Sequence, residues 1–305
     1  MALAELTPYA HDWQADFEYP DPRIITDDKT NRIIGHGPDR LVVIADWDGV
    51  FTAKEQIGPA GTNFGVMRSC MTGENQLEHE ALLNTHLTLE KQGKLTASVA
   101  RFWQTSALAL MSGVALDKLT DRAREMIKVR DGAKAFSDVC KELGIPIVIK
   151  STGEAHMIEA VADENGLEPT VVVANRLHTV NGVVIPRNTN DPASIVVPGT
   201  LVDSFNKNSF SHHELLDGPA RDNVVLLGDN IHDLDMVHDH EVDTALRMFQ
   251  DGGKEAVLEF EGLQRWQELQ SLRSLAGNRF DILALRSDFR GPTSFIGAVA
   301  LGHTG

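Results

Sequence analysis

Four short, strongly apolar segments, separated by long stretches, place the tightest limit on how this chain of 305 residues can fold. Runs of this length, rich in β-branched residues and bounded by turn residues, are typical of strands buried on both faces of a sheet. The segments are LVVIA (41–45), IPIVI (145–149), TVVVA (170–174) and NVVLLG (223–228).

Helical patterns lie between these predicted strands. Phe136, Val139, Cys140 and Leu143 recur at the spacing of one helix face, and Gly144 follows where such a helix would end. Strands that alternate with helices favour a parallel sheet with helices on both faces. We therefore predict an α/β fold, with a Rossmann-like parallel sheet flanked by helices.

Three shorter signals complete the expected core. Asn181-Gly182 predicts the turn of a β-hairpin over 180–184. The segment FDILAL (280–285) predicts a late strand, and TSFIGAVALG (293–302) predicts a closing helix.

The stretch between the first two predicted strands is too long for an ordinary connection. Apolar residues recur there at helical spacing, first around Trp103 and again from Leu116 to Ile127. We predict a helical cap domain over 53–130, inserted after the first strand. The catalytic core then comprises 1–52 and 131–305.

Acidic residues collect directly after two of the predicted strands. Asp46 and Asp48 follow the first strand, and Asp229 and Asp233 follow the strand at 223–228. Because ligands bind at the carboxyl ends of parallel strands, we expect these carboxylates to meet at one edge of the sheet. Either they bind a hard divalent cation, for which Mg²⁺ is the best candidate, or each only caps a strand or begins a turn.

The overall charge limits the partners of this chain. The formal net charge is −16, which disfavours binding to nucleic acid or to anionic membranes through broad basic patches. The two cysteines, Cys70 and Cys140, lie far apart and form neither a disulfide framework nor a zinc motif. The first residues lack the pattern of a signal peptide, and no segment is long and apolar enough to span a membrane. We therefore expect a cytoplasmic protein.

The motifs resemble those of the haloacid dehalogenase superfamily of phosphotransferases. VVIADWDGVFT (42–52) matches the first motif, IVIKST (147–152) the second, and LLGDNIHD (226–233) the fourth. Within the superfamily, the chain is most similar to the cytosolic pyrimidine 5′-nucleotidases (5′-nucleotidase III). The tryptophan-bearing segment ARFWQTSALAL (100–110) and DSFNKNS (203–209) carry that similarity. This chain has Lys150 where the family has Phe, Val50 where it has Thr, and Glu154-Ala155-His156 where it has Ile-Gly-Asp. The resemblance therefore does not determine which nucleobase the substrate carries.

This resemblance implies a role for each residue of the predicted site. Asp46 would be the nucleophile that forms an aspartyl-phosphate. Asp48 would protonate the leaving alcohol and then accept a proton from water. Ser151 would bind a phosphoryl oxygen, and Lys207 would neutralise charge on the transferred group.

The resemblance also implies the metal ligands. Mg²⁺ would be held by Asp46, the backbone carbonyl of Asp48, and Asp229, with Asp233 orienting Asp229 or a metal-bound water. The activity that the resemblance implies is hydrolysis of a small phosphomonoester, namely a nucleoside 5′-monophosphate.

Several alternatives stay open at this point. Thr152 is an alternative to Ser151, and Lys150 to Lys207. The phosphoryl group could pass to another alcohol instead of water, or the substrate could be another small phosphorylated metabolite. A non-catalytic binding protein with the same fold is a further alternative, and the sequence makes no prediction of oligomeric state.

Overall fold

The computed structural model describes residues 17–18, 26–53, 62–188, 190–249, 281–284 and 288–302. Its central element is a seven-stranded sheet with the order β1-β9-β8-β7-β2-β3-β4. Neighbouring strands are parallel except for β1, which pairs with β9 in the antiparallel sense. The strands are β1 (Phe17–Glu18), β2 (Leu41–Ala45), β3 (Ile147–Glu154), β4 (Val171–Asn175), β7 (Asn223–Gly228), β8 (Thr244–Phe249) and β9 (Ile282–Ala284).

The two central strands, β2 and β7, determine where the acidic segments emerge. Every residue of both strands is buried, as expected for strands covered on both faces. Their register pairs Ala45 with Leu227, and the Asp46 amide donates to the Leu227 carbonyl over 3.0 Å. The residues that follow these strands therefore leave the sheet at the same edge and at the same level.

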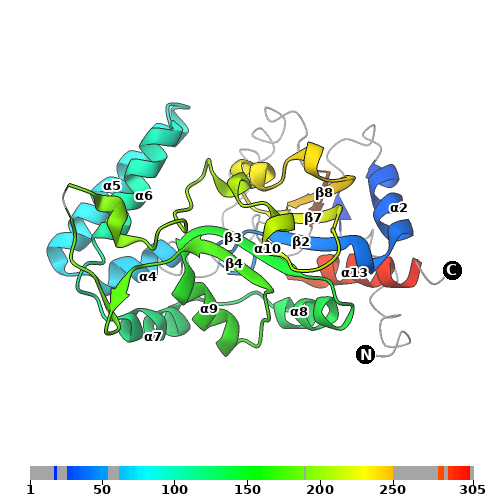
Figure 1. Cartoon of the computed structure of the whole chain (residues 1–305), viewed down its shortest axis with the longest axis horizontal. Coiled ribbons are helices and arrows are strands. Elements are labelled where there is room, and N and C mark those ends of the chain that lie inside the picture. Colours follow the sequence, from blue (N-terminus) through cyan, green and yellow to red (C-terminus); the bar gives the residue numbers. More distant parts are fainter. Residues whose placement is uncertain are drawn as a thin grey trace.

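Helices flank the sheet as predicted (Figure 1). The predicted helix over 136–143 is confirmed, and Gly144 follows it with φ +65°. The closing helix over 293–302 is confirmed as part of α13. The core helices with bounds are α2 (Thr26–His36), α8 (Ala133–Glu142), α9 (Ala155–Glu164), α10 (His212–Leu215) and α13 (Arg290–Gly302).

The shorter strand predictions are also confirmed where the structure describes them. Asn181 and Gly182 both have positive φ between β5 (Thr179–Val180) and β6 (Val183–Val184), as a tight hairpin turn requires. The late strand is present as β9, while positions 280 and 285 lie outside the described residues.

The stretch after β2 is helical in its described part. Figure 1 shows α5 and α6 at the opposite end of the molecule from α2 and α13. The helix α7 packs against α9 of the core, and α4 contacts β3, so the helical insertion touches both a flanking helix and the sheet. Its division from the core at 53 and 130 remains a prediction. The helices of this insertion are α4 (Asn63–Cys70), α5 (Gly73–Lys91), α6 (Ala97–Ala109) and α7 (Leu116–Met126).

One strand differs from its predicted bounds. The apolar segment predicted a strand that ends at position 149, but β3 continues to Glu154. Its pairing with β4 is irregular between Lys150 and Glu154, where extended backbone continues without regular pairing. The continuation is not apolar in sequence, so an apolar pattern misses it. As a consequence Ser151 lies within the strand and not after it.

Among the described residues, no helix combines the length and the hydropathy that crossing a membrane would require.

Candidate active site

Three carboxylates meet at the carboxyl ends of the central strands. Asp46 follows β2, Asp229 follows β7, and Asp233 lies in the short helix η6 (Ile231–Met236). One oxygen of each lies within 4.8 Å of the other two. All three residues are buried, with at most 8% of their surface exposed. Three buried carboxylates at this separation repel one another unless cations lie among them.

Lys207 supplies one positive charge to this acidic cluster. Its Nζ lies 3.1 Å from Asp46 Oδ1 and 2.7 Å from Asp233 Oδ1. The residue begins the short helix η5 (Lys207–Ser209) and is buried. Burial lowers the pKa of Lys207, but the charges of Asp233 and Asp46 outweigh burial and raise that pKa above its ordinary value. The ammonium group is therefore held in its charged form.

The surroundings of Asp46 disfavour its ionised form despite the contact with Lys207. Burial raises its pKa to about 7; Lys207 opposes the shift, and the nearby charges of Asp233 and Asp48 add to it. Lys207 therefore does not restore the ordinary pKa of Asp46. An additional cation beside Asp46 would favour its ionised form.

Asp233 is held by protein donors on both carboxylate oxygens. Oδ1 accepts from Lys207, and Oδ2 accepts from the backbone amides of Asp229 and Asn230, at 3.1 and 2.9 Å. Gly228 makes this approach possible, because a Cβ there would lie 2.6 Å from the Asp233 Cβ. Asp233 therefore fixes the backbone that presents Asp229.

Asp48 and Ser151 lie on segments adjoining the acidic cluster. The Asp48 carboxylate is outside the three-carboxylate group and accepts from the backbone amide of Asn63, with its Oδ2 at 3.2 Å. Ser151 lies on β3, beside β2, and its Oγ accepts from the Gly153 amide over 3.0 Å. The turn after Asp48 contains Gly49, whose φ of +89° favours glycine.

The structure separates the alternatives that the sequence leaves open for the lysine. Lys150 is buried, and its Nζ donates to the Met236 carbonyl over 2.7 Å. Burial lowers its pKa to about 8, with a smaller opposing effect of Glu241. Lys207, and not Lys150, contacts the acidic cluster.

Sequence reasoning missed two residues that shape the site. Asn230 caps η6 with a reciprocal capping box to Asp233, and the spacing of an Asn and an acid three residues later is a readable signal for such a box. Asn63 reaches the site from the helical insertion, and no sequence pattern relates it to Asp48.

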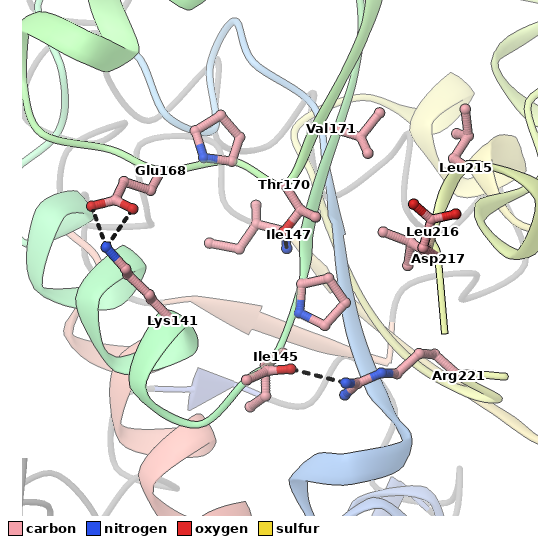
Figure 2. A pocket seen from close by; sticks show the side chains of 13 residues that line it. Lys141, Ile145, Ile147, Glu168, Thr170, Val171, Leu215, Leu216, Asp217 and Arg221 are labelled. Carbon is pink, nitrogen blue, oxygen red and sulfur yellow. Dashed lines mark hydrogen bonds and ion pairs between the residues drawn. The ribbon is translucent and has the colours of Figure 1, made fainter. Parts of the chain in front are cut away.

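A large groove lies at the opposite edge of the sheet from the acidic cluster, near the starts of β3 and β4 (Figure 2). Its volume is about 590 Å³, and its walls include Ile145, Ile147 and Val171 near the starts of β3 and β4. Two of its charged side chains pair with each other and a third bonds to the backbone: Lys141 pairs with Glu168 at 2.7 Å, and Arg221 donates to three backbone carbonyls. Among its described lining residues, the groove therefore lacks a buried group of carboxylates like the one at the acidic cluster.

Comparison with known proteins identifies the family. A family model described as pyrimidine 5′-nucleotidase (UMPH-1) matches residues 59–249, which is more than half of the chain. The chain belongs to the pyrimidine 5′-nucleotidase family. The predicted family is thereby confirmed, and the matching model describes a phosphatase class of enzyme.

A curated relative supports this membership. A putative cytosolic 5′-nucleotidase 3 of Caenorhabditis elegans is 25% identical over 228 residues, which cover 68% of this chain and 58% of that protein. The chain therefore matches only 58% of that relative's length.

Solved structures confirm the predicted fold class. Cytosolic 5′-nucleotidase IIIB bound to cytidine superposes with a TM-score of 0.73 at 19% identity, covering 100% of this chain and 99% of that one. A probable phosphoserine phosphatase from Vibrio cholerae superposes with a TM-score of 0.54 at 12% identity, covering 87% of this chain and 66% of that one. This chain thus has the fold of haloacid dehalogenase-type phosphatases.

Proposed function

We propose that this protein is a Mg²⁺-dependent phosphomonoesterase that hydrolyses nucleoside 5′-monophosphates through an aspartyl-phosphate on Asp46. The observation that carries this proposal is the convergence of Asp46, Asp229, Asp233 and Lys207 at one edge of the sheet. A buried group of carboxylates with a lysine beside it suits a reaction in which a cation and a phosphoryl group bind together.

The donor set of the acidic cluster fits Mg²⁺. The available side-chain atoms are carboxylate oxygens, which are the ligands that this hard cation prefers. Asp46, Asp229 and the backbone carbonyl of Asp48 would hold the ion, while Asp233 keeps its two oxygens on protein donors. When bound, Mg²⁺ would offset the repulsion between the carboxylate nucleophile and an anionic phosphate.

The chain's own carboxyl groups account for the first half of the reaction. An Asp46 oxygen attacks the phosphorus, a new phosphorus–oxygen bond forms, and the bond to the ester oxygen breaks. Asp48 gives its proton to that oxygen, so the nucleoside leaves as a neutral alcohol. The Asp46 environment, with Lys207 Nζ 3.1 Å from Oδ1, places positive charge where the phosphoryl group would be transferred.

The second half returns the enzyme to its starting state. Water attacks the phosphorus of the aspartyl-phosphate, and the bond to Asp46 breaks. Asp48 accepts the proton of that water, so both carboxyl groups are regenerated and inorganic phosphate is released. Ser151 donates to a phosphoryl oxygen in this scheme, because a hydroxyl oxygen that accepts from Gly153 can still donate its hydrogen.

Two observations support a nucleoside leaving group. The structural relative 5′-nucleotidase IIIB was solved with cytidine bound. In this chain, aromatic rings gather in the helical insertion beside the site. The ring centroid of Trp103 lies 4.9 Å from that of Phe64 and 4.3 Å from that of His86. The neighbouring Gln104 donates to the Thr152 carbonyl over 2.8 Å, so this aromatic group adjoins the end of β3.

The cellular setting we propose is the cytoplasm, in line with the name of the curated relative. The helical insertion would cover the bound substrate and exclude water during the first step. No nucleic-acid or membrane partner forms part of this proposal.

A phosphate-release screen tests the proposal directly. The purified protein is assayed against pyrimidine and purine nucleoside monophosphates and sugar phosphates, with Mg²⁺ and with excess chelator. We expect Mg²⁺-dependent release from nucleoside monophosphates and no release by Asp46→Asn. Wild-type rates in Asp46→Asn would overturn the mechanism, and transfer to an added nucleoside acceptor in preference to water would make the enzyme a phosphotransferase.

A further inference from the structure

Asn63 connects the helical insertion to the catalytic end of the sheet. It is the first residue of α4 and is fully buried. Its backbone amide donates to the Asp48 carboxylate, at 3.2 Å from Oδ2 and 3.4 Å from Oδ1. Its side-chain Oδ1 accepts from the Glu154 amide over 2.9 Å. One residue of the insertion thus touches the segments after β2 and within β3 together.

The Asn63 side chain packs directly against the backbone of Gly153. A Cβ at Gly153 would lie 2.7 Å from the Asn63 Cγ and 2.9 Å from its Nδ2. The Gly153 amide in turn donates to Ser151 Oγ. The side-chain amide of Asn63 therefore rests directly on the stretch of backbone that orients the Ser151 hydroxyl.

The start of α4 is fixed independently of the catalytic groups. Thr62 caps the helix, with its Oγ1 accepting from the Gly65 amide over 3.2 Å. The carboxylate of Asp48 lies at the amino end of this helix, where exposed amides favour negative charge. The direction of the Asn63 amide, and with it the Asp48 contact, follows from how α4 sits against β3.

We infer that Asn63 is a positioning residue: it couples the seating of the helical insertion on the core to the orientation of Asp48. This inference rests on the proposed function, in which Asp48 protonates the leaving group. Removal of the Asn63 side chain breaks the bond to Glu154 and loosens the contact of the capped α4 with β3. Asp48 then loses its fixed donor geometry, while Asp46 and Lys207 keep their mutual contact.

The leaving group of the substrate distinguishes this role from a merely structural one. A nucleoside is a poor leaving group and needs the proton of Asp48, whereas p-nitrophenolate leaves readily without it. We expect Asn63→Ala to lower kcat on a nucleoside monophosphate about 10- to 100-fold, part of the ~10²–10⁴-fold that a general acid supplies. On p-nitrophenyl phosphate, we expect a loss below about 3-fold.

Two further variants complete the experiment. Gly153→Ala pushes on the same amide from the other side. Because the Gly153 amide also donates to Ser151, we expect a loss on both substrates that is clearly larger on the nucleoside monophosphate. Asn75→Ala is the matched control, because Asn75 donates to the Leu110 carbonyl within the insertion and touches no catalytic segment in the described structure. We expect this control to keep wild-type rates on both substrates.

Each result decides the inference. A clearly larger loss on the nucleoside monophosphate, in Asn63→Ala and Gly153→Ala, supports it. An equal loss on both substrates, or no loss, overturns it. If Asn63→Ala does not fold, Gly153→Ala gives the decision. A wild-type protein that hydrolyses neither substrate refutes the proposed function itself, which is a separate outcome.

Discussion

The two ends of the central sheet handle charge in opposite ways. At the starts of β3 and β4, the large groove of about 590 Å³ pairs Lys141 with Glu168 in solvent and gives Arg221 three carbonyls. At the ends of β2 and β7, Asp46 and its acidic neighbours are buried against one lysine. The first arrangement leaves its ion pair exposed to solvent, and the second concentrates three carboxylates in a buried site.

This difference teaches that a buried concentration of charged groups locates the site better than cavity size does. Exposed ion pairs contribute little to stability and do not require a ligand. Buried carboxylates that lack enough cations are costly for folding, and such groups persist at positions where function requires them. Matched substitutions at the two ends can break or sharpen this contrast.

The largest effect is expected at the nucleophile. Asp46→Asn should lower phosphatase activity about 10⁴-fold or more, because the amide cannot form the phosphorylated intermediate. Glu168→Gln makes the same chemical change in the groove and should keep wild-type kcat/KM. Steady-state phosphate release measures both, and comparable losses in the two variants would erase the contrast between the ends.

The next largest effect is expected from replacing one lysine at each end of the sheet. Lys207→Met removes the cation beside Asp46 and should lower kcat about 10²–10³-fold, the range for loss of one preorganised charge. Lys141→Met removes an exposed cation at the groove and should change kcat less than 2-fold, which is about the effect of a surface pair. A kcat series in saturating Mg²⁺ provides the comparison. Equal changes in kcat in the two variants would show that the charge of Lys207 has no specific role in catalysis.

Metal dependence should respond to the residue that presents Asp229. Asp233→Asn weakens the bonds to the Asp229 and Asn230 amides. We expect the Mg²⁺ concentration for half-maximal activity to rise about 10- to 100-fold, as for other residues that orient a metal ligand. Asp217→Asn, at the groove, serves as the control in the same Mg²⁺ titration. Activity that survives excess chelator in the wild type would contradict metal dependence altogether.

The smallest effect concerns the pH dependence of stability through Lys150. Its pKa is lowered to about 8 from 10.5 by burial, so between these values the unfolded state binds more protons than the folded state. Stability should therefore rise with pH across this window, and the gain should be absent in Lys150→Met. Urea unfolding of the metal-free proteins at pH 8 and pH 10 measures the two slopes. Parallel slopes would show that Lys150 is not held in a desolvated site.

Much of the fold could be predicted because its signals are local. The apolar segments that became β2 and β7 are fully buried, and Asn181-Gly182 forms its turn through intrinsic backbone preference. The extension of β3 to Glu154 could not be predicted from the same signals. It continues through polar residues whose extended conformation depends on neighbouring segments.

The candidate site divides in a similar way. Asp46 and Asp229 follow apolar strands, and the rule that ligands bind at strand ends predicts that they meet. The distance between Asn63 and Asp48 depends on how α4 seats against the core, which no periodicity reports. The same holds for Lys150 and Lys207: only the tertiary structure directs one to Met236 and the other to Asp46.

The central claim is that Asp46, Asp229 and their neighbours form one site for a cation and a phosphoryl group. A crystal structure of the protein with Mg²⁺ and beryllofluoride, a phosphoryl analogue, tests it most directly. The account predicts one Mg²⁺ about 2.0–2.1 Å from oxygens of Asp46 and Asp229, with the beryllium on the other Asp46 oxygen. Mg²⁺ or beryllofluoride bound elsewhere, with the acidic cluster empty, would contradict it.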